Sequence, residues 1–349
     1  GQFLFLIPIM LCIIVLWGGM QIAATCSMRI FPQYFLIRQM YWLAAGMIVF
    51  VLTCFLPFHK WLKCSPFFLG GICLCLCILL FTGTKTNGST GWFRLWNSIY
   101  LQPSEFTKTI LILYLSQQGE KISEYKKRKI DWKVFLSMSI PTMICCLLVL
   151  AEPDFCSFLL FFISFVVIFY VAGGSIMQLI LSFCVALVPV IPFLIWKPYA
   201  WNRIISFFQD GSWHHEQFRY ALARGGLFGC GDGGSFWANF YLPYSHTDSI
   251  YAAIVERTGL IGGVLVLVLF LFICFCFLRL SLRASSRAGK IYIFSSGCMI
   301  MVQALLHISV NVLLLPTTGV TLPFISYGGS SLLSCMLMMG IVFSALRRH

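Results

Sequence analysis

The sequence predicts an all-α, polytopic membrane protein, because its composition is strongly apolar and its apolar residues gather in long runs. Of the 349 residues, 60% are hydrophobic and only 10% are charged. About 20 helical residues cross the ~30 Å hydrocarbon layer of a bilayer, so the chain has room for about ten transmembrane helices. No polar segment is long enough to build a core of its own. Residues 1–349 are therefore expected to form a single integral membrane domain.

Ten apolar runs can be separated along the chain, and the fourth of them is short and charged at its ends. The first residues lack a basic segment and a small-residue cleavage site, so we expect no cleaved signal peptide. The predicted spans are residues 3–20, 40–56, 66–81, 106–116, 134–150, 156–171, 176–195, 250–278, 291–315 and 331–346.

The distribution of lysine and arginine predicts the orientation of these spans. Basic residues are densest in 121–133, in 279–290 and in the C-terminal tail, and a ten-span arrangement places all three clusters on one side. A count of nine or eleven spans would separate them. Because cytoplasmic loops carry an excess of Lys and Arg, both termini are expected to be cytoplasmic. The segments then expected outside are 83–104, the turn 152–154, one large extracytoplasmic loop 196–249, and 316–330.

Net charge and cysteine content exclude two other classes of protein. The formal charge of +13 is not gathered in a soluble domain with exposed aromatic residues, so nucleic acid is not expected as a partner. Anionic lipid head groups or a phosphorylated lipid explain the excess more simply. The 16 cysteines, such as Cys73, Cys75 and Cys77, mostly lie in apolar runs. At two-residue spacing they point about 200° apart on a helix, so they are expected to be buried apolar residues.

Asp248 is the first candidate for chemistry, since it stands just before an apolar run in a chain with only 11 acidic residues. A carboxylate at a membrane boundary is costly unless it has a role. His246 and Thr247 precede it directly. Glu256, eight residues later, would lie about 80° around the same helix and could face the same cavity. The alternative interpretation is that Asp248 only caps the following helix.

Glu105 and Lys108 form the second candidate pair. The stretch Gln102-Pro103-Ser104-Glu105 is typical of a helix N-terminus, and a spacing of three residues places Glu105 and Lys108 on one helix face. A simple cap with an ion pair explains this spacing equally well. An ammonium group at the predicted membrane boundary, however, favours a function.

Two stretches rich in glycine or proline each allow more than one interpretation. The segment 315–331 contains Pro316, Pro323 and several glycines at membrane depth, which is tolerated where the backbone is buried in protein or lines a cavity. Small residues there would also allow close helix packing. The glycine run 225–235 resembles a phosphate loop, but no strand precedes it, so this signal is weak.

Taken together, these motifs resemble the SEDS family (shape, elongation, division and sporulation), to which FtsW-like and RodA-like proteins belong. Five stretches match in family order, and the Leu-Pro…His-Thr-Asp and Pro-Phe-Ile-Ser-Tyr-Gly-Gly-Ser-Ser motifs are the most specific. Ala151-Glu152-Pro153-Asp154 and the end of the last motif favour the FtsW type. The matching stretches are 91–94, 102–108, 151–154, 241–248 and 315–331.

The resemblance implies an enzyme of the bacterial cytoplasmic membrane. Family members polymerise lipid II into peptidoglycan strands at the outer face, and they work with a class B penicillin-binding protein during division or elongation. It implies that the carboxylate of Asp248 is the catalytic group, and we expect it to act as general base in an inverting glycosyl transfer. No cofactor is expected with certainty, and a divalent cation is one candidate source of positive charge. The residues expected to contact substrate are Arg94, Glu105, Lys108, Asp154, Arg203, Gln217, His246, Thr247 and Glu256.

The chain departs from the family pattern at three places near these residues. It has Glu256-Arg257 where the family has two glutamates, Phe155-Cys156 after Asp154 where the family has Leu-Gly, and Phe218 where the family has serine. The proposed acid is retained, so the activity is still expected.

Two other classes of function compete with the enzyme. A flippase for the lipid-linked precursor would also place charged residues and broken helices in a membrane cavity. It would make no glycan polymer, whereas a polymerase would. A scaffold without catalysis would leave Asp248 as a helix cap.

Overall fold

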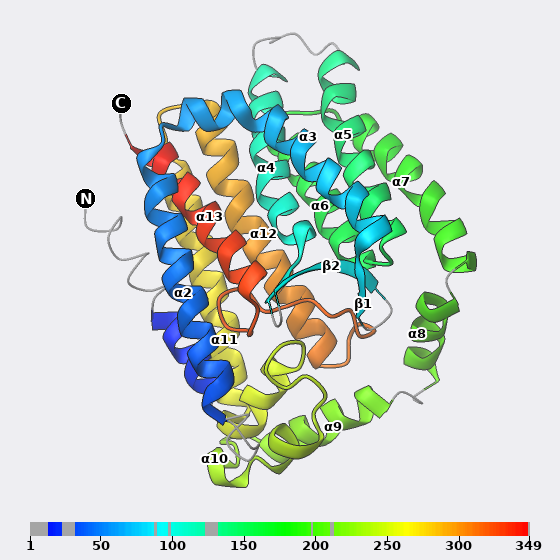
Figure 1. The fold of residues 1–349 in the computed structure, drawn as a ribbon, viewed down its shortest axis with the longest axis vertical. Helices are drawn as coiled ribbons and strands as arrows, with labels where there is room; N and C mark the ends of the chain where they lie inside the picture. Colours follow the sequence, from blue (N-terminus) through cyan, green and yellow to red (C-terminus); the bar gives the residue numbers. More distant parts are fainter. Residues whose placement is uncertain are drawn as a thin grey trace. The chain divides into compact units, whose positions relative to one another are not determined.

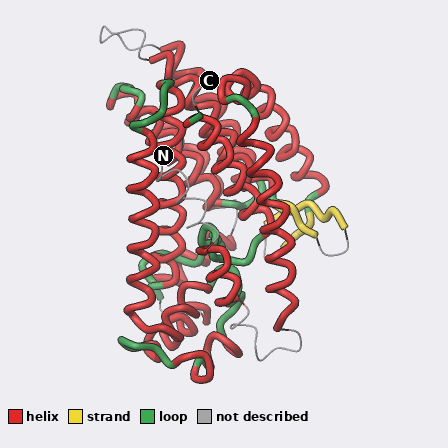
Figure 2. Tube along the Cα trace, turned by 90° about the vertical axis from the view of Figure 1, so that its left-hand side faces the viewer, coloured by secondary structure: helices red, strands yellow, loops and turns green. Residues whose placement is uncertain are grey.

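The computed structural model describes residues 13–22, 32–86, 89–96, 99–122, 132–196, 198–209 and 213–347, and these are mainly helical (Figures 1 and 2). Each of the ten predicted spans coincides with a helix, although residues 3–12 of the first lie outside the described part. The helices are Ile13–Ile22, α2 (Pro32–Phe55), α3 (Phe58–Thr82), α4 (Pro103–Ile122), α5 (Trp132–Ala151), α6 (Phe155–Val171), α7 (Ile176–Trp196), α11 (Ile250–Ser281), α12 (Arg287–Asn311) and α13 (Gly329–Leu346).

The prediction of an all-α, polytopic membrane fold is confirmed. Seven helices among the described residues are long and apolar enough to cross a membrane, and Ile13–Ile22 and α6 are shorter apolar helices. The remaining predicted span falls on α4, which carries Glu105 in its first turn and Lys121 in its last. The total of ten spans stays a prediction.

By its internal contacts the chain divides into two compact units. The first comprises Gly1–Met47, Asn202–Cys276 and Ile300–Leu333, and the second comprises Ile48–Trp201, Phe277–Met299 and Ser334–His349. Among the described residues, five helices, α2, α8, α11, α12 and α13, have residues in both units. The prediction of one integral membrane domain is not tested by this division.

The second unit is built around α4. This helix packs against α3, α5 and α6 (Figure 1). Its residues Leu111, Ile112, Leu113 and Leu115 are fully buried. A helix that is buried on all sides can carry polar residues in its sequence and still be central to the fold, which explains the weak apolar signal of this span.

The second unit also contains a small antiparallel sheet that the sequence analysis did not predict. It has the order β1 (Thr84–Thr86), β2 (Ser89–Trp96), β3 (Ile99–Leu101), and appears in yellow in Figure 2. Thr84 pairs with Trp92, and Arg94 pairs with Tyr100. The signal for it was the Asn87-Gly88 pair between two runs rich in threonine and aromatic residues, which is typical of a hairpin.

In the first unit, the segment expected as a large loop is largely folded into short helices. These are α8 (Pro198–Phe208), which begins in the second unit, α9 (Trp213–Gly225), α10 (Gly231–Gly234) and the π-helix η1 (Trp237–Tyr241). Phe218 and Ala221 of α9 pack in one apolar cluster with Ala252 and Ala253 of α11. Burial of these side chains is what gives the segment a fixed structure.

Candidate functional site

The backbone of the His246-Thr247-Asp248 motif is held by hydrogen bonds to three successive carbonyl groups. The Tyr327 N–H donates to His246 O at 2.8 Å, and the Ser326 hydroxyl donates to Thr247 O at 2.8 Å. The Asn311 side-chain amide donates to Asp248 O at 3.0 Å. All three donors lie in the C-terminal third of the chain. Two distant parts of the sequence are therefore joined at this motif, within the first unit.

The side chains of the motif lie among aromatic rings and a glycine turn. The His246 ring is 4.3 Å from the Phe35 ring and 5.7 Å from the Tyr327 ring, measured between centroids. A methyl group added at Gly319 would lie 3.7 Å from Asp248 Oδ2. Gly319 has a positive φ of 72°, which glycine adopts without strain. The 315–331 segment therefore passes directly beside the carboxylate.

The second unit brings together Glu105, Lys108 and Asp154. Lys108 Nζ lies 2.7 Å from Glu105 Oε2, and both side chains are largely buried. The Ser334 hydroxyl of α13 donates to Glu105 O at 2.6 Å, which fixes the first turn of α4. The charges of Glu105 and Lys108 both act on Asp154, so the three groups are electrostatic neighbours.

Asp154 also caps α6, which the sequence analysis did not consider. Its two carboxylate oxygens accept from the backbone N–H and the hydroxyl of Ser157, at 3.0 and 2.6 Å. Burial raises the pKa of Asp154, while the bonds from Ser157 lower it and the charge of Glu105 raises it. Burial also raises the pKa of Glu152, which is the first residue of the turn 152–154 and is fully buried, to about 8.

The hydrogen bonds of Glu256 and Gln217 go to η1 and not to the His246-Thr247-Asp248 motif. Glu256 accepts from the backbone N–H groups of Trp237 and Ala238, at 2.9 and 2.6 Å, and thereby holds the start of η1. Gln217 Oε1 accepts from the Trp237 indole at 2.8 Å. Both side chains are buried and serve the packing of α9 and η1. These hydrogen bonds give both residues a structural role, and their contact with substrate stays a prediction.

Three arginines remain from the sequence analysis, and each has a different position in the structure. Arg94 is exposed on β2. Arg203 belongs to α8, but its side chain lies outside the described part of the chain. Arg257, the departure from the family pattern, is buried, and its guanidinium donates to Gln21 O at 2.9 Å and lies 3.7 Å from Asp232. The positive charge of Arg257, which replaces the negative charge of the family pattern, is therefore bound by Gln21 and Asp232.

Part of the glycine run 225–235 packs closely against the backbone of α11. A Cβ at Gly225 would lie 2.3 Å from Val255 O, and one at Gly229 would lie 2.0 Å from Arg257 O. The backbone also bonds across, with Cys230 N–H donating to Glu256 O at 2.9 Å. Glycine is needed here because two backbones touch. This contact explains Gly225 and Gly229 without a phosphate, whereas a Cβ at Gly226, Gly231 or Gly233 would meet nothing within 4 Å.

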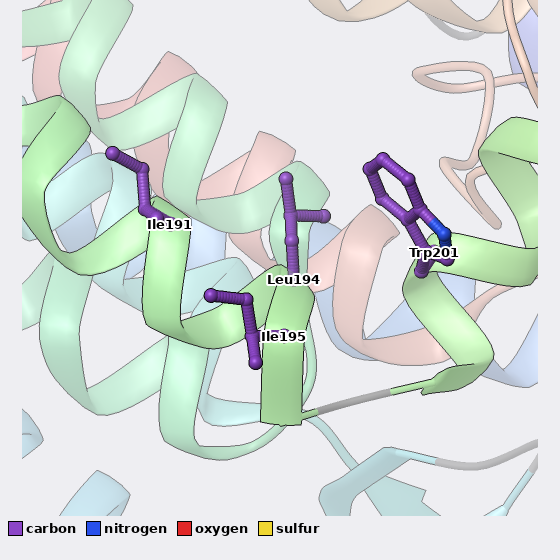
Figure 3. Close-up of a pocket in the computed structure, with 4 residues that line it drawn as sticks. All are labelled: Ile191, Leu194, Ile195 and Trp201. Atoms are coloured by element: carbon purple, nitrogen blue, oxygen red, sulfur yellow. The ribbon is translucent and has the colours of Figure 1, made fainter.

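An apolar hollow of about 420 Å³ is lined by Ile191, Leu194 and Ile195 of α7 and by Trp201 of α8. Figure 3 shows the three aliphatic side chains on one helix and the indole on the next. No titratable group is among these four residues, so the hollow is not a place for acid–base chemistry. Across the described residues, no group of three His, Cys, Asp or Glu side chains could hold a metal ion.

Fold and site together define a class: a polytopic helical membrane protein whose acidic residues gather at helix ends. The chain belongs to the family whose model is described as "Cell cycle protein" (FTSW_RODA_SPOVE), which matches residues 2–349. The resemblance found in the sequence motifs is thereby confirmed.

Similar proteins cover almost the whole chain. A protein of Coxiella burnetii is 33% identical over 348 residues, covering 93% of this chain and 91% of its own, and one of Saccharophagus degradans is 32% identical over 326 residues, covering 89% and 82%. Both are named "Probable peptidoglycan glycosyltransferase FtsW".

Two solved structures share the fold. The rod shape determining protein RodA of Thermus thermophilus has a TM-score of 0.72 and 23% identity, covering 96% of this chain and 94% of its own. A chain from a structure of a peptidoglycan synthase complex, described as coordinating polymerization and crosslinking, has a TM-score of 0.79 and 23% identity, covering 96% and 95%.

Proposed function

We propose that this chain is a peptidoglycan glycosyltransferase that polymerises lipid II into glycan strands at the outer face of the bacterial cytoplasmic membrane. The names of the relatives, which match nearly the full chain, support the activity. The observation that supports Asp248 as its centre is the fixation of three successive carbonyl groups at 246–248. Such fixation holds in place the backbone that carries the carboxylate.

In the proposed reaction, Asp248 acts as general base on an attacking sugar hydroxyl. The carboxylate takes the hydroxyl proton while the oxygen forms a bond to the anomeric carbon of the second sugar. The bond from that carbon to the diphosphate oxygen breaks, and the lipid diphosphate leaves with the electron pair. Attack from the opposite face inverts the configuration. General-base catalysis of this kind contributes about 10²–10⁴-fold.

The leaving diphosphate needs positive charge more than it needs a proton. Lys108 is proposed for this role, with Arg94, Arg203 or a divalent cation as alternatives. Glu105 holds the Lys108 ammonium at 2.7 Å and thereby fixes its position. Asp154, whose pKa responds to both charges, completes this cluster. His246 and Thr247 are proposed to position Asp248 and to contact the sugar.

The proposed partner is a class B penicillin-binding protein that crosslinks the strands. The fold likeness to a chain of a complex that coordinates polymerization and crosslinking supports this assignment. The excess of Lys and Arg in 121–133 and 279–290 supports cytoplasmic termini, which place residues 241–248 outside.

The test is polymerisation of labelled lipid II by the purified chain with its class B partner, analysed by gel electrophoresis. The wild type should make long strands. Asp248→Ala should lower the rate by at least about 10²-fold, and it should still fold, because the three hydrogen bonds to the backbone carbonyls of 246–248 remain.

The matched control is Glu216→Gln, which removes an exposed carboxylate of α9 in the same unit and should keep the full rate. Polymer formation by Asp248→Ala at the wild-type rate would refute the general base. A wild type that moves lipid II across vesicles but makes no polymer would instead support the flippase.

A further inference from the structure

Three buried polar side chains lie one helical turn apart on α12. Gln303 is 3% exposed, His307 is 1% exposed and Asn311 is fully buried. Residues four apart on a helix lie on one face, so these three form a polar ladder in an otherwise apolar span. A buried polar group costs free energy unless it is hydrogen-bonded, and an apolar side chain would avoid this cost. The ladder therefore requires a reason beyond membrane insertion.

Each residue of the polar ladder binds a backbone carbonyl outside its own helix. The Gln303 amide donates to Thr321 O at 3.0 Å. His307 Nδ1 lies 2.6 Å from Val320 O, and because a carbonyl only accepts, this nitrogen carries the proton. Asn311 Nδ2 donates to Asp248 O at 3.0 Å. The ladder thus holds both the motif that contains Asp248 and the turn that passes beside it.

Asn311 has the most complete set of contacts. Besides Asp248 O, its Nδ2 donates to His307 O at 2.9 Å, and its Oδ1 accepts from the Ala252 N–H at 3.1 Å. One amide thus connects the end of α12 with residues on both sides of the start of α11. An Asn amide has two donors and one accepting oxygen, and all three groups are used.

The turn that Gln303 and His307 hold is the same turn that lies beside the Asp248 carboxylate. The residues that follow it, Val320 and Thr321, are the ones whose carbonyls His307 and Gln303 bind. Gly319 itself faces Asp248 Oδ2. The ladder therefore sets the position of Asp248 from its backbone and the position of the neighbouring turn at the same time.

We propose that Asn311 is a positioning residue for Asp248, supported by Gln303 and His307, and that it aligns the carboxylate through its backbone carbonyl. This inference rests on the proposed function of Asp248 as general base. Asn311 does not touch the reacting atoms. Its loss should therefore lower kcat and leave lipid II binding unchanged, since misplacement of a catalytic group by ~1 Å can cost about 100-fold in rate.

Two variants test this, with the class B partner present and lipid II as substrate. Asn311→Leu removes every hydrogen bond of the amide. Asn311→Asp keeps the size and the acceptor for the Ala252 N–H, but it lacks a donor toward Asp248 O while ionised. Both should lower kcat by about 10–100-fold and change KM by less than about twofold.

The pH profile separates positioning from a general loss of folded protein. Burial at this position raises the pKa of the new carboxyl of Asn311→Asp, so that it becomes protonated as the pH falls and regains an O–H donor. The ratio of wild-type to Asn311→Asp kcat should therefore shrink as the pH falls, at equal amounts of folded protein measured by gel filtration. Asn311→Leu should keep a constant ratio.

Ser295→Ala serves as the matched control, since Ser295 is a buried polar residue of the same helix, 3% exposed and about four turns earlier. It should keep wild-type kcat. Wild-type kcat in folded Asn311→Leu or Asn311→Asp, or a rise in KM at unchanged kcat, would overturn the inference. If Asn311→Leu does not fold, Asn311→Asp alone decides.

The two proposals can fail separately. Polymerisation that is lost in Asp248→Ala but retained in both Asn311 variants overturns the positioning role and leaves the proposed function intact. A wild type that makes no polymer overturns both.

Discussion

At the N-termini of α4 and α6, Glu105 and Asp154 are held by other side chains, whereas at 246–248 three successive backbone carbonyls accept hydrogen bonds. Glu105 pairs with Lys108, and Asp154 accepts two hydrogen bonds from Ser157. His246, Thr247 and Asp248 instead accept through their main-chain oxygens. Side-chain replacement should therefore disturb the fold in the first region. In the second region the hydrogen bonds to the backbone remain after a side-chain replacement, so the fold should change less.

The strongest test of this comparison is Lys108→Met. It leaves Glu105 as a largely buried carboxylate without its ammonium partner, and removal of one member of a buried pair costs about 3–5 kcal/mol. The melting temperature in detergent should fall well below that of Asp248→Ala. The double variant Glu105→Gln/Lys108→Met should recover much of the loss. Equal melting temperatures for Lys108→Met and Asp248→Ala would contradict the comparison.

Glu152, in the turn between α5 and α6, should make the stability of the second unit depend on pH. The folded protein keeps the proton up to a pKa of about 8, whereas the unfolded chain loses it near 4.5. Stability from this group is therefore complete below about pH 4.5 and is lost as the pH rises to about 8. Melting temperatures measured from pH 5 to 8.5 should fall more steeply in wild type than in Glu152→Gln. Parallel curves would exclude this role.

The smallest expected effect is at the cap of α6. Ser157→Ala removes the hydroxyl that donates to Asp154 but keeps the backbone N–H bond, whereas Asp154→Ala removes both. Loss of an N-cap costs about 1 kcal/mol, so Asp154→Ala should be the less stable of the two in chemical denaturation. The reverse order would mean that the charge near Glu105, and not the cap, decides the stability here.

The helices were predictable from sequence because a membrane span leaves a long apolar run. All ten predicted runs fall on helices, including α4, where the apolar run is short. The segment 196–249 was expected as a loop because its glycines and polar residues break the apolar signal. Its fixed structure arises from contacts such as those of Phe218 with Ala252, which no local pattern reveals.

The candidate site was predictable only in part. Asp248 and the Glu105–Lys108 pair stand out because charges are rare in this chain. The contact of Glu256 and Gln217 with substrate stays a prediction. Their hydrogen bonds to η1 could not be predicted, because they depend on how α9 and α11 pack. Asn311 was missed, although its spacing of four and eight residues from His307 and Gln303 was visible. That spacing shows a shared face, but it does not show which backbone carbonyls the face will meet.

The break in α11 at Gly259 has a consequence for how this protein can vary. Gly259 has a φ of 74°, and a Cβ there would lie 2.2 Å from Leu227 O. Together with Gly225 and Gly229 it forms a joint in which backbone touches backbone. Alanine scanning measures a contact by removing atoms, but here every substitution adds them. Such a joint cannot be weakened gradually, so sequences should either keep these glycines or replace the whole joint at once.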